Sequence, residues 1–154
     1  MPAPVHLPVL ILSILAFAPC TLGAPTPERI PIDHVPSGFP VGFCLLTTGG
    51  RQHVAYYNAD HQMTVASRAP GDSTWTRTHL PSKIGWDSHN YLTMAADDDG
   101  HLHLSGNMHC VPLIYFRTTR PGDTTSFAQI ETMVGSEEDR CTYPQFMRGP
   151  ENEL

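Results

Sequence analysis

A repeat of about fifty residues is the feature that most constrains the fold of this chain. Residues 50–55 (GRQHVA) match residues 100–105 (GHLHLS), and residues 68–72 (RAPGD) match residues 119–123 (TRPGD) at nearly the same offset. Because 15 prolines and 12 glycines interrupt the chain too often for long helices, each repeat predicts short strands joined by turns.

Period-two alternation and β-branched or aromatic residues predict four strands in each repeat. The expected strands are residues 41–47, 52–57, 63–68 and 74–79, then 91–96, 101–105, 113–117 and 127–132, with a third unit beginning near Tyr143. Four short antiparallel strands at this period are typical of β-propeller blades. We therefore predict an all-β propeller with two four-stranded blades and the start of a third. A small β-sandwich that is complete in itself is the alternative.

The number of expected blades bears on the chain's completeness. A propeller closes with roughly 4–8 blades, and two blades leave open faces and strand edges. The sequence stops at Leu154, where a further strand is expected, so we expect an N-terminal fragment of a longer protein that is inactive alone. For the isolated 154 residues this predicts poor solubility or partial folding.

The N-terminal residues indicate export. An apolar run over residues 9–18 is followed by small residues up to Ala24, and ten apolar residues are too few for a membrane span, which needs about 20. We predict a signal peptide over residues 1–23, a linker over 24–38 and a partial propeller domain over 39–154, with secreted or periplasmic location and no membrane span after cleavage. A lipoprotein anchor at Cys20 is a weaker alternative.

Charge and cysteine content exclude some functions. The net charge of −6, without any basic stripe, opposes nucleic-acid binding. Signal removal would leave Cys44, Cys110 and Cys141. A Cys110 to Cys141 disulfide and three unbonded thiols are equally open alternatives. No CxxC or HxxxH cluster concentrates ligands, so no metal site is predicted, and the cofactor stays unknown.

Two histidine segments flank one expected hairpin, residues 86–90 (WDSHN) and residues 106–109 (GNMH). In a propeller, the loops entering the innermost strands and those joining the second and third strands lie near one mouth of the channel. Imidazole has the unperturbed pKa closest to neutrality, so two imidazoles there can divide acid and base roles. We predict His89 and His109 as catalytic residues.

Other polar and aromatic residues of these segments are predicted to bind substrate. Trp86 offers a ring that stacks on sugars, although packing between blades is an alternative role. Asn90 is expected to contact a hydroxyl or to orient His89, and Asn107 is expected at the same mouth. Asp87 is expected to cap the turn together with Ser88.

Residues 84–117 (IGWDSHNYLTMAADDDGHLHLSGNMHCVPLIYFR) resemble the propeller family of bacterial neuraminidase repeat (BNR)-containing proteins, and the resemblance covers nearly all of residues 39–154. Within that family the segment is similar to the ulvan lyases, seven-bladed propellers that cleave acidic polysaccharide by β-elimination. The resemblance implies that a histidine in a DSHN-like segment and a second about twenty residues later line the active cleft; these match His89 and His109. It also implies a tyrosine and an arginine beyond Leu154.

This resemblance implies a secreted polysaccharide lyase acting on a uronic-acid polymer, with acidic polysaccharide as its partner. A sialidase-type glycoside hydrolase is one alternative, although it needs a Tyr/Glu nucleophilic pair and an arginine cluster, and this portion displays no such cluster. A non-catalytic carbohydrate-binding propeller is the other.

Overall fold

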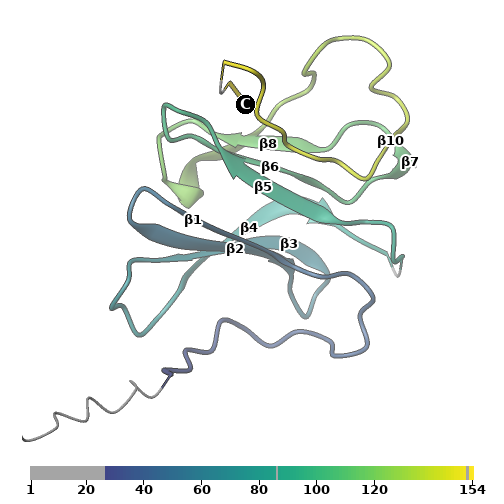
Figure 1. The fold of residues 1–154 in the computed structure, drawn as a ribbon. Helices are drawn as coiled ribbons and strands as arrows, with labels where there is room; N and C mark the ends of the chain where they lie inside the picture. Colours follow the sequence, from purple (N-terminus) through teal and green to yellow (C-terminus); the bar gives the residue numbers. More distant parts are fainter. Residues whose placement is uncertain (1–26, 86, 152) are drawn as a thin grey trace, which may run out of the picture.

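The computed structural model describes residues 27–85, 87–151 and 153–154, which form an all-β structure (Figure 1). The expected signal peptide and Trp86 lie outside the described residues. Each of the two four-stranded sheets follows the order of its strands in the sequence, and every neighbouring pair is antiparallel. This is the arrangement of two consecutive propeller blades, and it confirms the fold class predicted from the repeat.

The strands lie close to their predicted positions. The first sheet contains β1 (Cys44–Thr48), β2 (Arg51–Tyr57), β3 (Gln62–Arg68) and β4 (Thr76–Lys83). The second contains β5 (Leu92–Ala96), β6 (Leu102–Gly106), β8 (Tyr115–Thr118) and β9 (Phe127–Gln129), with a 3₁₀ helix, η1 (Thr124–Ser126), before β9. A short unpredicted pair, β7 (His109–Val111) with β10 (Cys141–Thr142), forms a separate two-stranded sheet.

The core lies between the two sheets, which are stacked face to face in Figure 1. Alternation along β2 turns Ala55 and Tyr57 toward the second sheet, while β6 and β8 turn Leu104 and Phe116 toward the first. Leu104 and Phe116 are almost completely buried, and burying side chains of this kind stabilises a fold by about 1.5–3 kcal/mol each. The apolar faces of the two blades therefore fix their mutual position.

The outer face of the first sheet is covered by the stretch that precedes β1 (Figure 1). Ile32 packs against a cluster that includes Val54 and Tyr56, and the Tyr56 hydroxyl donates to Oδ2 of Asp33 at 2.7 Å. Part of the segment predicted as a linker, residues 24–38, is thus attached to the first blade.

The chain that follows β10 crosses the outer face of the second sheet (Figure 1). The Phe146 ring lies 5.9 Å from the ring of His103, and the Arg148 guanidinium pairs with Asp98 at 2.8 Å. This segment contains the residues expected to begin a third blade near Tyr143; those described there after β10 form no further strand.

His53 and His103 occupy equivalent positions in the two blades, as the repeat predicts. His53 lies opposite Ser67 and His103 lies opposite Arg117, and these partners in the third strands are also fifty residues apart. Their surroundings differ. His103 contacts Asp97 at 3.0 Å and the Tyr115 hydroxyl at 2.6 Å. His53 is fully buried beside a cavity of about 440 Å³, and its two imidazole nitrogens have no hydrogen-bond partner among the described residues. Burial lowers the pKa of this imidazole to about 4. The two histidines thus share one position in the blade, but among the described residues only the His103 ring has polar partners.

The three described cysteines, Cys44, Cys110 and Cys141, are all unbonded thiols, which favours the second of the two alternatives left open by the sequence. Burial raises the pKa of the Cys44 thiol to about 11, whereas Cys110 is exposed. Among the described residues no helix is long and apolar enough to cross a membrane.

Gly106 gives a test of the packing at the start of the second blade. A Cβ atom there would lie 2.6 Å from Cδ2 of Leu92 and 2.7 Å from the carbonyl oxygen of Tyr91, so Gly106→Ala must displace the first residues of β5. We expect the free energy of unfolding to fall by about 1–3 kcal/mol in thermal denaturation followed by circular dichroism. Gly42→Ala is the control, because a Cβ at Gly42 meets no atom within 4 Å. Equal stability of the two variants would contradict the described packing.

Candidate active site

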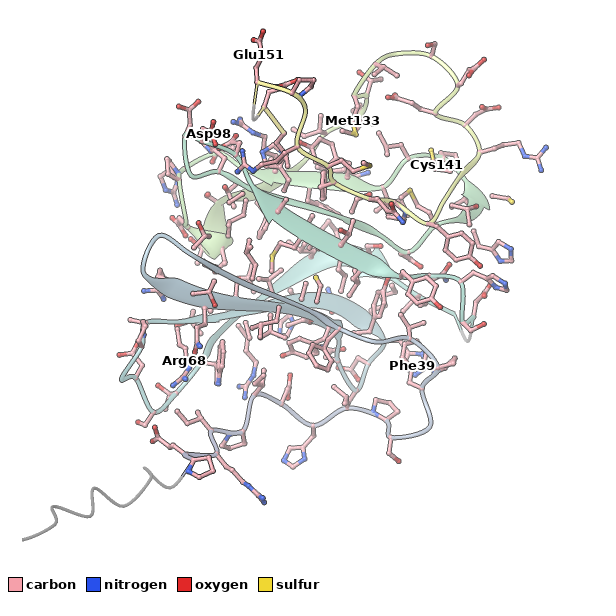
Figure 2. All side chains as sticks on the ribbon, in the orientation of Figure 1. Phe39, Arg68, Asp98, Met133, Cys141 and Glu151 are labelled. Atoms are coloured by element: carbon pink, nitrogen blue, oxygen red, sulfur yellow. The ribbon has the colours of Figure 1, made fainter. Side chains whose placement is uncertain are left out.

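The structure brings the two predicted catalytic histidines together at one end of the stacked sheets. His89 lies in the loop before β5, and His109 begins β7 after β6. Their rings are stacked, with centroids 4.1 Å apart and planes 25° from parallel. Figure 2 marks this end by Phe39 and Cys141, and the opposite end by the hairpin residues Arg68 and Asp98. The convergence expected from the loop positions is confirmed.

Asp87 links the two histidines. Its Oδ1 accepts a hydrogen bond from the backbone N–H of His89 at 2.9 Å, which is the turn-capping role predicted for it. The same oxygen lies 2.6 Å from Nδ1 of His89, and Oδ2 lies 2.7 Å from Nδ1 of His109. The backbone N–H of His89, followed by the two imidazoles, holds the pKa of the Asp87 carboxyl well below its usual value. One carboxylate therefore contacts the Nδ1 atoms of both imidazoles.

The histidine pair lies on an open surface. The side chains of His89 and His109 are 43% and 41% exposed, and the side chain of Asp87 is 34% exposed. Both imidazoles are thus within reach of a bound polymer, and the carboxylate that holds them is less accessible than either ring.

Asn107 fixes the second histidine segment onto the first blade. Its backbone is in the left-handed region, with φ of 59°, which asparagine tolerates better than most residues. Its Nδ2 donates to the Ser82 hydroxyl at 2.8 Å and to the carbonyl oxygen of Lys83 at 3.0 Å, both at the end of β4. These bonds give Asn107 a structural role that its sequence does not reveal; its predicted contact with substrate stays a prediction.

Asn90 lies in the loop before β5, and its predicted contact with a substrate hydroxyl stays a prediction. The residue is buried, and its side-chain Oδ1 has no hydrogen-bond partner among the described residues. Its carbonyl oxygen accepts a hydrogen bond from the Tyr57 hydroxyl at 2.9 Å, which ties the loop to the first blade. Its side chain makes no described hydrogen bond to His89, so Asn90 anchors the loop through its backbone. Trp86, the remaining predicted contact, lies outside the described residues.

Two tyrosines that the sequence does not assign to the site lie beside the histidine pair. The Tyr143 ring lies 5.9 Å from the ring of His89 and 5.5 Å from the ring of Tyr91, and both tyrosines are exposed. Tyr143 reaches this position because β10 pairs with β7. No sequence spacing indicates that pairing, so Tyr143 was not predictable as a neighbour of His89.

The first blade carries a related pair of rings at the same end. Phe39 lies before β1 and His61 lies before β3, and their rings are stacked with centroids 5.2 Å apart. The first strands of the two blades are offset by 49 residues, because Leu46 lies opposite His53 and Ala95 lies opposite His103. Stacked rings are therefore found at this end of both blades.

Among the described residues, one group has a composition suited to a metal ion: Asp87, His89 and His109. One donor atom from each lies within 4.8 Å of the others. A ligating imidazole places the metal close to its ring plane. The two rings are stacked and nearly parallel, and their Nδ1 atoms already face the carboxylate. This arrangement suits hydrogen bonding rather than coordination of one ion.

The fold and this polar ring pair define an all-β protein of the propeller class with a surface site at one end of its blades. The family model for BNR repeat-containing proteins matches residues 51–154, and the chain belongs to that family. This confirms the family resemblance of residues 84–117.

Two solved structures are similar to the chain, and both are described as ulvan lyases of a new polysaccharide lyase family, PL25. The match to one has a TM-score of 0.54 at 17% sequence identity and covers 70% of this chain and 29% of the lyase chain. The other lyase is bound to -[GlcA(1-4)Rha3S]-; its match has a TM-score of 0.54 at 16% sequence identity and covers 79% of this chain and 31% of the lyase chain. These likenesses show a shared fold, and the chain spans less than a third of either lyase chain. No curated protein sequence matches it.

Asn107→Asp tests the attachment of the His109 segment. The change replaces an N–H donor by a carboxylate that faces the carbonyl oxygen of Lys83, and we expect it to lower the free energy of unfolding by about 1–3 kcal/mol. Asn107→Gly also loses the two bonds, but it suits the left-handed backbone and creates no repulsion, so its loss should be smaller. Thermal denaturation measures both variants. A stability of Asn107→Asp equal to that of the unmodified protein would contradict the described contacts.

Proposed function

We propose that this chain supplies the histidine part of the active site of a polysaccharide lyase that cleaves a uronic-acid-containing polysaccharide by β-elimination. The observation that carries the proposal is the stacked, half-exposed pair of His89 and His109, both of which contact the Asp87 carboxylate through Nδ1. The proposal includes export from the cytoplasm, which the apolar run over residues 9–18 favours.

The proposed reaction needs one base and one acid on neighbouring atoms of the polymer. The base takes the proton on the carbon next to the uronate carboxylate, and the electron pair forms a carbon–carbon double bond. The glycosidic C–O bond breaks, and the acid protonates the departing oxygen. An unprotonated imidazole and an imidazolium, held 4.1 Å apart between ring centroids, are suited to these two tasks on one sugar linkage.

Removal of this weakly acidic proton also needs a positive group that neutralises the uronate carboxylate. Within the described residues, the ion pairs of His89 and His109 both go to Asp87. The proposal therefore assigns carboxylate neutralisation to a group outside this cluster, in agreement with the tyrosine and arginine that the family resemblance implies beyond Leu154.

Two comparisons support the substrate class. The chain belongs to the BNR repeat-containing family, and one of the similar solved structures is an ulvan lyase bound to a saccharide that contains glucuronic acid. Exposed Tyr91 and Tyr143 beside the pair offer ring faces of the kind that stack on sugars. The same tyrosines favour a non-catalytic carbohydrate-binding propeller as the second candidate.

The test uses the protein from its complete reading frame, including whatever is coded after Leu154, with uronic-acid polysaccharides as substrates. We expect ultraviolet absorbance from unsaturated uronate products, and a decrease in rate of about 10²-fold or more in His89→Ala and in His109→Ala, because each loses an acid or a base. His34→Ala is the control, since His34 is exposed in the stretch before the first blade.

The other outcomes decide between the candidates. New reducing ends without ultraviolet absorbance would indicate hydrolysis and overturn the lyase proposal. Saturable binding without cleavage would assign the site to carbohydrate binding. Full activity in both histidine variants would show that the pair takes no part in the reaction.

A further inference from the structure

We propose that Asp87 is a positioning residue that holds both imidazoles in one tautomer, with the proton on Nδ1 and the lone pair on Nε2. The inference rests on the proposed function for its catalytic consequence, and on the geometry of three side chains for its structural part. It assigns to Asp87 a role beyond the turn capping that its sequence position indicates.

The tautomer follows from the donors and acceptors at the carboxylate. An ionised carboxylate only accepts hydrogen bonds. Nδ1 of His89 lies 2.6 Å from Oδ1, and Nδ1 of His109 lies 2.7 Å from Oδ2, so each Nδ1 must carry the proton in its bond. No described residue makes a hydrogen bond to Nε2 of either ring. Both Nε2 atoms are therefore left as the reactive nitrogens.

One carboxylate shared by two rings also limits their charge. The single negative charge compensates one imidazolium, and a second positive ring stacked 4.1 Å away would be uncompensated. The other titratable groups beside the pair are Tyr143, whose ring lies 5.9 Å from that of His89, and Cys110, which follows His109. Neither supplies a second negative charge while it is protonated. The geometry thus offers one carboxylate to two imidazoles.

The tautomers can be measured without substrate. In protein labelled with ¹⁵N-histidine, long-range ¹⁵N–¹H spectra distinguish Nδ1 from Nε2 protonation of neutral imidazole. At a pH high enough for both rings to be neutral, we expect both His89 and His109 as the Nδ1–H form, although free histidine prefers Nε2–H. In Asp87→Asn at least one ring should change to Nε2–H. Asp99→Asn removes the same charge from an exposed turn of the same blade and should leave both signals unchanged.

The kinetic part uses the same two variants with uronic-acid polysaccharide. Asp87→Asn should lower kcat by about 10²–10⁴-fold, as expected when a catalytic imidazole loses the carboxylate that sets its tautomer, while KM changes less than about threefold. Asp99→Asn should keep both constants. A purely structural role for Asp87 would instead lower the amount of folded protein, which circular dichroism reports, without a selective effect on kcat.

The outcomes separate the two proposals. Nε2–H tautomers in the unmodified protein, or unchanged tautomers and kcat in Asp87→Asn, would overturn the role of Asp87. If Asp87→Asn fails to fold, the tautomers of the unmodified protein still decide the structural part. If the unmodified protein shows the Nδ1–H pair but cleaves no uronic-acid polymer, the lyase proposal fails and the positioning by Asp87 stands.

Discussion

The apolar contact between the two blades determines where every residue of the candidate site lies. Ala55 and Tyr57 of the first sheet face Leu104 and Phe116 of the second, and the alternation along each strand places these side chains on the inner faces of the two sheets. Since the strands run antiparallel and in sequence order, the loop before β5 and the connection after β6 leave the stack at the same end. The proximity of the two histidines thus follows from the strand order of the second blade, and contacts with the first blade hold both loops in place.

Chemistry is added to this scaffold by a small number of polar contacts. Asn107 attaches one histidine segment to the end of β4, and the Tyr57 hydroxyl attaches the other through the carbonyl oxygen of Asn90. Asp87 then joins the two imidazoles. The first blade also has stacked rings at this end, Phe39 and His61. In the second blade the fold brings the two imidazoles together, and one carboxylate contacts both.

Much of this architecture was predictable, because repeats and strand periodicity are local properties of a sequence. The fifty-residue offset placed the blades, and the positions of His89 and His109 relative to the strands predicted their convergence. The remaining features depend on contacts that spacing does not encode. The side chain of Asp87 reaches a residue 22 positions away, Tyr143 arrives through the β7 and β10 pair, and Asn90 turns inward. Each of these follows from loop conformation, which tertiary contacts determine.

The most direct test of the account is the distance between the two imidazoles in solution. Nuclear Overhauser effects between the ring protons of His89 and His109 report whether the rings are stacked, and they require neither substrate nor activity. The account predicts cross-peaks between the two rings in the folded protein, and their weakening in Gly106→Ala, where the start of β5 must move. Assigned ring protons of both residues with no cross-peak between them would contradict the stacked pair on which this account of the site depends.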